Sequence, residues 1–491
     1  MLESPSIRSA RLLVLLLAIA LLSGCFSIIR SKGGAQTRSD NARHIRAADI
    51  ALPRGYRIEA VATGLNFPTG VAIDAQGIPH VVEAGYSYGE VFSTPRLLRV
   101  ETDGVTTVVA SGANGPWNGV AFHEGAFYIS EGGAQSGGKI LRIDNDGKTT
   151  ALVENLPTQG DHHTNGPAIS PDGFIYFGVG SATNSGVVGT DNADFGWLAR
   201  EPAFHDIPAK DIKLTGRNFT TKNPLTTESD DETVTGAYVP FGTSTEQGQM
   251  IEGQMPCNGA ILRTPLAGGT PELVAWGLRN PYGFAFANDG ELFVTENSFD
   301  VRGSRPIFGT GDLVWKIEQD TWYGWPDFFG GEPLASERYS PPGGKAPQFL
   351  LAEHPQTPPA PLAKLGVHSS SNGLDISRNE TFGHVGELFI AQFGDMAPNV
   401  GKVEAPVGYR IVRVDPQTGI IRTFAANRGD KNGPASKLKG GGFERPNDVQ
   451  FDPTGRVMYV VDFGIMTITD GKVQPRENTG VLWRITREGG R

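Results

Sequence analysis

The apolar positions of the chain recur in six short phrases of the same form. Each phrase has an alternating apolar stretch, a turn that contains Gly or Asp, and a second apolar stretch. Alternation with period two and such frequent turns predicts pairs of short β-strands. The phrases cover residues 67–78, 116–129, 164–177, 280–294, 371–377 (continuing at 386–390) and 445–460.

Repeats of one form indicate an array in which each unit buries its faces against its neighbours. Helical periodicity is almost absent, so the sequence predicts an all-β fold, a six-bladed β-propeller over residues 50–491. Closure of the ring is expected to pair 56–62 with 481–485. Further strands are expected at 97–100, 106–110, 139–143, 313–317 and 409–414.

Two long insertions separate the phrases, at about 184–259 and 298–368. Both contain Trp, Tyr, Phe and Gly, a composition unlike that of disordered segments. Long loops in a compact domain are often functional, so we expect ordered loops that cap one mouth of the channel. The alternative is crossing strands and decoration without a role.

The N-terminus has the form of an export signal. Arg8 and Arg11 precede an apolar run at 12–22, which is too short to span a bilayer, and Leu22-Ser23-Gly24-Cys25 follows. This ending resembles the bacterial lipobox, which implies a signal peptide at 1–24, a lipidated Cys25, and anchoring to the outer membrane, facing the periplasm. Residues 25–49 are expected to form a tether, and the alternative is an ordinary signal with an incidental Cys.

The composition argues against several classes of function. The net charge is −10 and no basic run is present, which argues against nucleic-acid binding. Only two cysteines occur, and neither a zinc-site pair nor a C-x-x-C-H haem attachment motif is present.

Polar residues follow the second strand of several phrases at equivalent places. Symmetry would place them around one rim, and a ring of carboxylates with loop carbonyls suits Ca²⁺. The alternative is that these side chains only hydrogen-bond loop backbone. They are Glu83, Glu131, Glu296, Gln392 and Asp462.

Basic groups stand immediately before three phrases. In G-D-H-H-T-N-G, Asp161 could set the tautomer of His162 and raise its basicity, as a general base requires. Arg279 and Arg445 precede two other phrases, and an Arg fork suits a carboxylate or a developing oxyanion. We expect His162, Arg279 and Arg445 to converge on one mouth, although a metal site, a structural role and surface salt bridges are open alternatives.

Four longer motifs carry a resemblance to a known family. They are D-H-H-T-N-G-P-A-I-S-P-D-G, W-G-L-R-N-P-Y-G-F-A-F, G-D-L-V-W-K-I with W-Y-G-W-P-D, and E-R-P-N-D-V-Q-F. Together the chain resembles the soluble quinoprotein glucose/sorbosone dehydrogenases, six-bladed propellers that use pyrroloquinoline quinone (PQQ) and Ca²⁺. The resemblance extends over most of the chain after residue 50.

The resemblance implies roles for individual residues. The catalytic base falls on His162, with Asp161 before it and His163 as the fallback, and Arg279 lies near the reacting quinone oxygen. The remaining assignments are Asn280, Arg445 and Asp462 at the cofactor, Asn447 where the family can carry a second Arg, and Asp312, Tyr323, Gly303 and Ser304 at Ca²⁺.

These observations lead to one hypothesis about the function and to two alternatives. The hypothesis is PQQ-dependent oxidation of a sugar or a related hydroxyl or aldehyde substrate, with an external electron acceptor. The first rival is a Ca²⁺-dependent propeller hydrolase that acts on lactones. The second is a non-catalytic binding propeller, for which the mouth loops would be the interaction surface.

Overall fold

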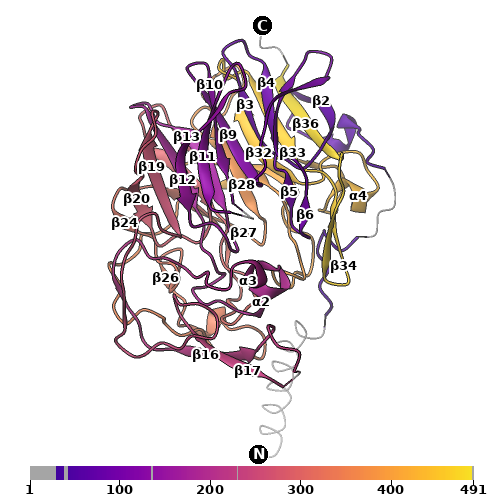
Figure 1. The fold of residues 1–491 in the computed structure, drawn as a ribbon. Coiled ribbons are helices and arrows are strands. Elements are labelled where there is room, and N and C mark those ends of the chain that lie inside the picture. Colours follow the sequence, from indigo (N-terminus) through magenta and orange to yellow (C-terminus); the bar gives the residue numbers. More distant parts are fainter. Residues whose placement is uncertain (1–28, 38–41, 134–135, 229, 489–491) are drawn as a thin grey trace, which may run out of the picture.

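The structure is a computed structural model, and it describes residues 29–37, 42–133, 136–228 and 230–488. Almost all regular structure is β, and the expected six-bladed propeller is confirmed (Figure 1). The innermost strands of neighbouring blades contact one another around a complete ring. Within the described part, no helix is long and apolar enough to cross a membrane.

Each blade is an antiparallel sheet, and five run outward from the channel in chain order. Blade I is β3 (Pro68–Ile73), β4 (Pro79–Glu83), β7 (Arg96–Val100) and β8 (Thr106–Ser111); blade II is β9 (Trp117–His123), β10 (Ala126–Glu131), β11 (Gly138–Asp144) and β12 (Thr149–Leu156). Blade III is β13 (Thr164–Ile169), β14 (Phe174–Val179), β19 (Ala260–Pro265) and β20 (Glu272–Trp276), with β24 (Thr321–Trp322) added in parallel. Blade IV is β21 (Pro281–Phe286), β22 (Leu292–Glu296), β23 (Gly311–Lys316) and β27 (Ala363–Val367). Blade V is β28 (Ser371–Ile376), β29 (Leu388–Gln392), β30 (Arg410–Val414) and β31 (Ile421–Asn427), with β1 (Ile50–Ala51) added at its edge.

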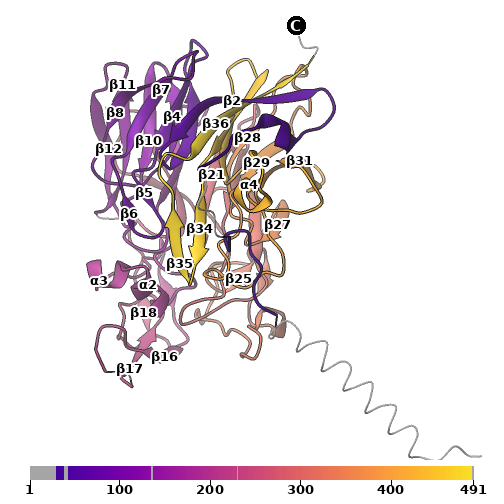
Figure 2. The ribbon, with the colours of Figure 1, turned by 90° about the vertical axis from the view of Figure 1, so that its right-hand side faces the viewer.

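Blade VI closes the ring with strands from both ends of the chain. Its order from the channel is β32 (Pro446–Phe451), β33 (Val457–Asp462), β36 (Gly480–Arg487) and β2 (Tyr56–Leu65). The pairing runs from Tyr56 opposite Arg487 to Leu65 opposite Gly480, which confirms the closure expected from the sequence. Figure 2 shows β2 and β36 side by side at the edge of this blade.

The apolar core lies in layers between neighbouring blades. The second strands β4, β10, β22 and β29 are buried along their whole length, because a blade packs against each of their faces. Between blades I and VI, for example, Val81 and Leu98 pack with Val461 and Leu482. A blade therefore has no separate core, and the six phrases fold as one unit.

The insertions gather at one end of the propeller, below the blades in Figure 1. The first, after β14, carries α2 (Thr190–Asp194), α3 (Trp197–Arg200), β15 (Ile212–Lys213), β16 (Asn218–Lys222), β17 (Glu232–Gly236) and β18 (Met250–Ile251). The second contributes β25 (Phe328–Phe329), β26 (Glu332–Pro333) and η2 (Glu337–Tyr339). This second stretch also supplies β23, which confirms the strand expected at 313–317, together with β24 and β27, which the sequence did not predict.

Several short elements complete the structure. They are η1 (Ala47–Asp49), the hairpin β5 (Tyr86–Ser87) with β6 (Val91–Phe92), the hairpin β34 (Met466–Thr469) with β35 (Lys472–Pro475), and α4 (Ala435–Leu438).

The stretch before β1 does not behave as a free tether over its described part. The backbone N–H of Gly34 donates to both carboxylate oxygens of Asp395 at 3.1 and 3.0 Å, and Ala35 is fully buried. Arg43 forms a buried ion pair with Asp462. The sequence suggested a tether because a short Gly-rich segment shows no hydrophobic periodicity, even where it packs against the rest of the protein. Cys25 and the signal at 1–24 lie outside the described residues.

Candidate active site

Six residues at equivalent places of the six inner strands encircle the channel. Four are asparagines, and the repeat brings them together because each lies just after its inner strand begins, next to a residue where neighbouring strands almost touch. At Gly70, for instance, a Cβ would lie 3.0 Å from the Cα of Gly119. We call this set the amide ring: Thr69, Asn118, Asn165, Tyr282, Asn372 and Asn447.

Two runs of hydrogen bonds connect members of the amide ring. Asn118 donates to Asn165 at 3.1 Å, and Asn165 donates to Asn280 at 2.7 Å. On the other side of the channel, Asn372 donates to Asn447 at 2.8 Å, and Asn447 donates to the hydroxyl of Tyr282 at 3.2 Å. The channel therefore has a neutral, hydrogen-bonded floor at this level.

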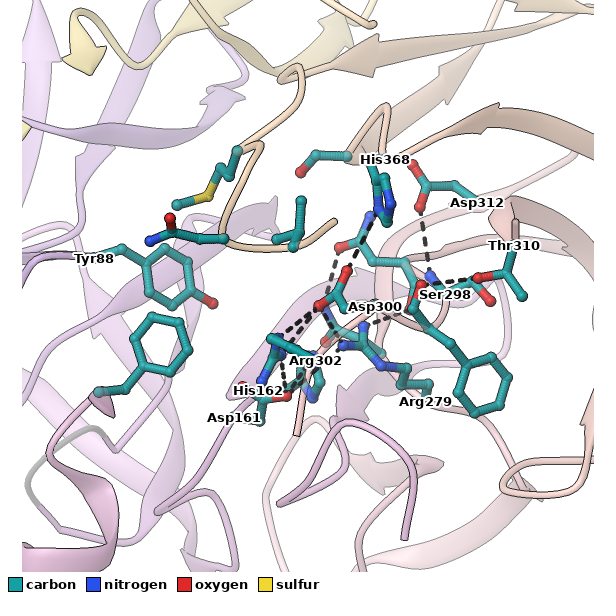
Figure 3. Close-up of a pocket in the computed structure, with 18 residues that line it drawn as sticks. Tyr88, Asp161, His162, Arg279, Ser298, Asp300, Arg302, Thr310, Asp312 and His368 are labelled. Atoms are coloured by element: carbon teal, nitrogen blue, oxygen red, sulfur yellow. Dashed lines mark hydrogen bonds and ion pairs between the residues drawn. The ribbon is translucent and has the colours of Figure 1, made fainter. Parts of the chain in front are cut away.

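Two adjoining cavities lie over this floor. The central compartment is lined by the amide ring together with an apolar wall. The outer compartment holds most of the charged groups (Figure 3). Their boundary is formed by the residues that line both: Tyr88, His162, Asn280, Asn297, Ser370 and Met396.

His162 stands at this boundary, and its Nε2 makes no hydrogen bond to any residue that the structure describes. Its Nδ1 lies 2.8 Å from the carbonyl oxygen of Ser181, which can only accept, so Nδ1 carries the proton. Nε2 is then an unprotonated acceptor, and the nearest carboxylate oxygen, of Asp161, is 3.8 Å away. Burial, and next the positive charge of Arg279, lower the pKa of His162 to about 3, so the ring is neutral near pH 7.

A network of buried ion pairs faces His162. Arg279 Nη2 lies 2.8 Å from Asp300 Oδ2, and Arg302 Nη2 lies 3.1 Å from the same oxygen. Arg302 also pairs with Asp161 and, at 2.6 Å, with Asp191. Burial alone would raise the pKa of Asp300, but the charges of Arg279 and Arg302 outweigh it and hold that pKa well below its usual range.

The guanidinium of Arg279 is fixed further by oxygens of the first insertion and of blade IV. Its Nε donates to the Asn184 carbonyl and its Nη2 to the Asn184 side-chain oxygen, both at 3.0 Å. Its Nη1 donates to the Asn297 carbonyl at 3.3 Å. A fork held on three sides is preorganised, which is the condition for stabilising charge that develops on a bound group.

His163 points into the central compartment. Its Nδ1 lies 3.4 Å from the Thr158 carbonyl, and its buried Nε2 has no hydrogen-bond partner among the described residues. The ring of Tyr86 packs edge-on at 5.8 Å. Burial lowers the pKa of His163 to about 4. A buried acceptor without a partner marks a place where a ligand could donate a hydrogen bond.

The loop that supports His162 is held by a second buried carboxyl. Asp206, in the first insertion, accepts the N–H of Ala182 at 2.6 Å and the hydroxyl of Thr183. Burial raises the pKa of Asp206 to about 7. The first insertion thus positions catalytic candidates and does not only decorate the mouth.

The structure brings together most of the residues singled out from the sequence. Asp161, His162, Arg279, Asn280 and Asp312 line the outer compartment, and His163 and Asn447 line the central one. Asn280 donates to Asn297 and so ties the boundary together. Their roles toward a cofactor remain predictions.

Arg445 does not join them, contrary to the expected convergence. Its side chain is fully buried behind the wall, and the guanidinium donates to the carbonyls of Phe393, Gly394, Asp395 and Met466. The repeat explains part of the error: His162 and Arg279 lie three residues before members of the amide ring, whereas Arg445 lies two before Asn447. Carbonyls of the neighbouring loops then draw its fork away from the cavity.

The side chains expected at a calcium rim are engaged with protein groups, and only some of them bond to loop backbone as the alternative proposed. Asp462 accepts the backbone N–H groups of Glu444 and Arg445 at 2.9 and 2.8 Å and the indole N–H of Trp483 at 3.3 Å. Glu131 and Glu296 likewise accept from the indoles of Trp117 and Trp315. Such strand-end carboxylates fasten the chain where it turns into a blade.

The resemblance implies two Ca²⁺ sites, a structural one at Asp312 and Tyr323 and one for the cofactor at the backbone carbonyls around Gly303 and Ser304, and both stay predictions. Asp312 accepts the N–H of Ser371 at 2.7 Å, whereas the hydroxyl of Tyr323 bonds to backbone at Glu318 and Lys316. Gly303 and Ser304 pack beside Asp191 and Gly189. Over the described ranges, no three His, Cys, Asp or Glu side chains are grouped to hold a metal.

Several site residues were missed from the sequence. Asp300 and Arg302 lie four and six residues after the end of β22, and a charged pair so close to a strand end was an available signal. His368, whose Nδ1 lies 3.6 Å from Asp300, precedes the fifth phrase and was an equally visible one. No feature of the sequence pointed to Tyr88 or Asn184, because only the packing of the β5–β6 hairpin and of the first insertion brings them to the site.

Fold and cavity together define a class, the six-bladed propellers with a ligand cavity at the mouth of the channel. No known family profile matches the sequence, and no curated protein is significantly similar to it. Among solved structures, the chain is similar to the calcium structure of a Trichoderma reesei carbohydrate-active enzyme of family AA12 (15% identity, 92% of this chain and 100% of that one, TM-score 0.52).

Two further solved structures share the fold. One is the holo form of the PQQ domain of pyranose dehydrogenase from Coprinopsis cinerea (15% identity, 94% of this chain and 100% of that one, TM-score 0.51). The other is the PQQ-bound aldose sugar dehydrogenase of Streptomyces coelicolor (17% identity, 89% and 100%, TM-score 0.50). At these identities the likeness establishes the fold that the resemblance implied.

The central compartment can be compared with the chemistry of PQQ, a flat fused quinone with three carboxylates. Its apolar wall and amide ring suit the ring system, and His163 Nε2 and the Asn280 amide suit a quinone edge. The carboxylates do not fit, because the described residues that line this compartment include no Lys or Arg. The site matches the reactive part of PQQ and not its negative charge.

Proposed function

We propose that this protein is a sugar dehydrogenase that oxidises a hydroxyl-bearing carbohydrate, or a related alcohol or aldehyde hydrate, with a quinone as the acceptor of two electrons. The observation that carries the proposal is His162, a neutral histidine whose free Nε2 borders both compartments and faces the fixed guanidinium of Arg279. The fold shared with sugar dehydrogenases supports it.

The chain's own residues suit the two halves of such a reaction. A substrate hydroxyl in the outer compartment would place its proton at Nε2 of His162, while the Nδ1–H group continues to donate to the Ser181 carbonyl. Asp161 would stabilise the resulting imidazolium at 3.8 Å. The quinone supplies the two-electron acceptor, and Arg279 and Asn280 would orient its oxygen-bearing edge. An external acceptor must then take up the electrons.

PQQ with Ca²⁺ is the form of this activity that the resemblance implies, and the first experiment tests it. Purified protein without the signal is assayed for dye reduction with aldoses, sorbosone and simple alcohols, with and without PQQ and Ca²⁺. Activity that requires a quinone supports the proposal. Turnover of lactones without any quinone would contradict it and favour the hydrolase, for which the described residues gather no metal-ligand set.

The two histidines give a matched pair for the same assay. His162→Ala removes the free Nε2 at the boundary, and we expect turnover to fall by at least ~10²-fold. His163→Ala removes a ring that lines the central compartment only. If His162→Ala keeps turnover and His163→Ala loses it, the base has been assigned to the wrong residue.

We also propose that the protein is exported and lipid-anchored through Cys25. The sequence L-S-G-C supports this, and the docking of residues 29–37 would leave only a few residues between the anchor and the propeller. Incorporation of labelled palmitate into the full chain, lost in Cys25→Ala, is the expected result. Labelling that persists in the variant would contradict the assignment.

A further inference from the structure

We infer that the central compartment is a seat for an uncharged quinone ring and that it selects against polyanionic quinones such as PQQ. This inference rests on the proposed function and specifies which quinone the site takes. It follows from the charges and surfaces around the compartment.

The described residues that line the compartment are electrically neutral. They comprise the amide ring, hydroxyl groups, apolar side chains and two histidines. Both histidines are buried, and burial lowers their pKa values to about 3 and about 4, so neither supplies a positive charge near pH 7. A carboxylate placed here would lose its water without gaining an ionic partner.

The nearest guanidiniums are already neutralised. Arg279 and Arg302 line the outer compartment, where they pair with Asp161 and Asp300. Asp312 lines the same cavity, so carboxylates outnumber guanidiniums there. A ligand with several negative charges would compete with these ion pairs and would meet no unneutralised cation.

Arg445 cannot take over this role without local unfolding. Its guanidinium donates to four backbone carbonyls and stacks on the rings of Phe393 and Tyr409 at 4.8 and 5.3 Å. Phe393 itself lines the compartment, so it stands between Arg445 and any ligand. Turning the fork inward would leave buried carbonyls unsatisfied.

The surfaces of the compartment suit a flat neutral ring. One wall belongs to an apolar cluster that includes Ala84, Phe393, Phe463 and Met466, with Met396 packed against it. The amide ring and the free Nε2 of His163 offer hydrogen bonds at the edge. An uncharged quinone has apolar faces and polar edges, which is the same division.

The test compares PQQ with its trimethyl ester, which keeps the ring and removes the three charges. Binding to the wild-type protein is measured by quenching of intrinsic fluorescence and by calorimetry, at low and high salt. We expect the ester to bind at least tenfold more tightly, with little dependence on salt. Tighter binding of PQQ would overturn the inference while leaving the proposed function intact.

A charge introduced at Met396 sharpens the test. Met396 lines both compartments and has an unbranched side chain close in size to Lys. Met396→Lys should raise PQQ affinity at least tenfold at low salt and leave ester affinity nearly unchanged, and Met396→Leu should do neither. Equal effects of Lys and Leu would show that size and not charge governs the site.

The remaining outcome separates the two proposals. If neither PQQ nor its ester binds to the wild type or to Met396→Lys, both the seat and the quinone-dependent function are overturned. If only the ester binds, and dye reduction in the presence of sugar follows its addition, both stand.

Discussion

Arg279 in blade IV and Arg445 in blade VI begin almost alike and end in different environments. Each stands just before an inner strand, and each donates its backbone N–H to the carboxylate at the end of the second strand, Glu296 in one blade and Asp462 in the other. The guanidinium of Arg279 meets side-chain oxygens of Asp300 and Asn184 at a cavity. That of Arg445 donates to backbone carbonyls and stacks on the rings of Phe393 and Tyr409.

The difference shows what a repeat determines and what it leaves open. The repeat places the backbone and the strand-end carboxylate in each blade. The surrounding loops decide where a long charged side chain goes, and the insertions reach the mouth beside blade IV. A basic residue next to a repeat is therefore a site candidate only where the loops leave it a cavity.

Substitution of Arg279 should have the largest effect. Arg279→Lys keeps a positive charge beside Asp300 but loses the fork that Asn184 and Asn297 hold in place. We expect the quinone-dependent turnover to fall about 10²–10³-fold, as for the loss of a preorganised donor. Steady-state dye reduction measures it, and a folded variant with full turnover would refute the assignment.

Substitution of Arg445 should instead affect the folded state. Arg445→Lys cannot satisfy four carbonyls at once, so buried acceptors lose their partners. We expect the free energy of unfolding to fall by about 2–4 kcal/mol, measured by denaturant titration. Turnover per folded molecule should stay within about threefold of wild type. A turnover defect as large as that of Arg279→Lys would place Arg445 in the site after all.

Lowering the pH should destabilise the protein through the two buried histidines on the same side of the channel mouth as Arg279. Burial first, and for His162 also the charge of Arg279, lower the folded-state pKa values of His162 and His163 to about 3 and about 4. In the unfolded chain both titrate near ~6.5, so the unfolded state binds more protons between those values. Stability should therefore be full above pH ~6.5 and fall as the pH drops toward ~3, by about 1.4 kcal/mol per pH unit for each histidine that the unfolded chain protonates and the folded protein does not.

Two variants test whether the buried histidines cause this pH dependence of stability. His163→Gln should flatten the fall in the free energy of unfolding between pH ~6.5 and ~4. Arg445→Lys should lower the whole curve without changing its slope, because it leaves both histidines in place. An unchanged slope in His163→Gln would mean that this ring is not buried in its neutral form in solution.

Much of the fold could be predicted from the sequence, because a blade needs apolar alternation and a turn at fixed places. The closing pair 56–62 with 481–485 and the six inner strands follow from that pattern. The site could be predicted where residues precede a phrase directly, as His162 and Arg279 do. Tyr88 and Asn184 could not, since a hairpin and the first insertion bring them to the site only through tertiary packing. Arg445 was misjudged because sequence shows the place of a side chain and not the carbonyls that compete for it.

The smallest expected effect concerns the segment 29–37, which docks on the Arg445 side. Gly34 donates to the carboxylate of Asp395, and Ala35 accepts from the N–H of Ile468 at 2.9 Å. Asp395 also accepts from Ala397 and Val407, so it keeps partners when the segment is removed. Deletion of residues 26–37 from the signal-free protein should therefore cost only ~1 kcal/mol and lower the melting temperature by a few degrees.

Gly34→Val is the matched variant for this deletion, because a Cβ at Gly34 would collide with the ring of Tyr409. The substitution should undock the segment without shortening the chain, and it should reproduce the loss of stability seen on deletion. Turnover in both variants should stay within about threefold of wild type, since the segment contacts Asp395 and not the residues around Arg279. If neither variant loses stability, the segment does not hold the Arg445 side in solution. If turnover falls with stability, the two sides are coupled through loop 393–400, which lines the outer compartment with Met396, Asn399 and Val400.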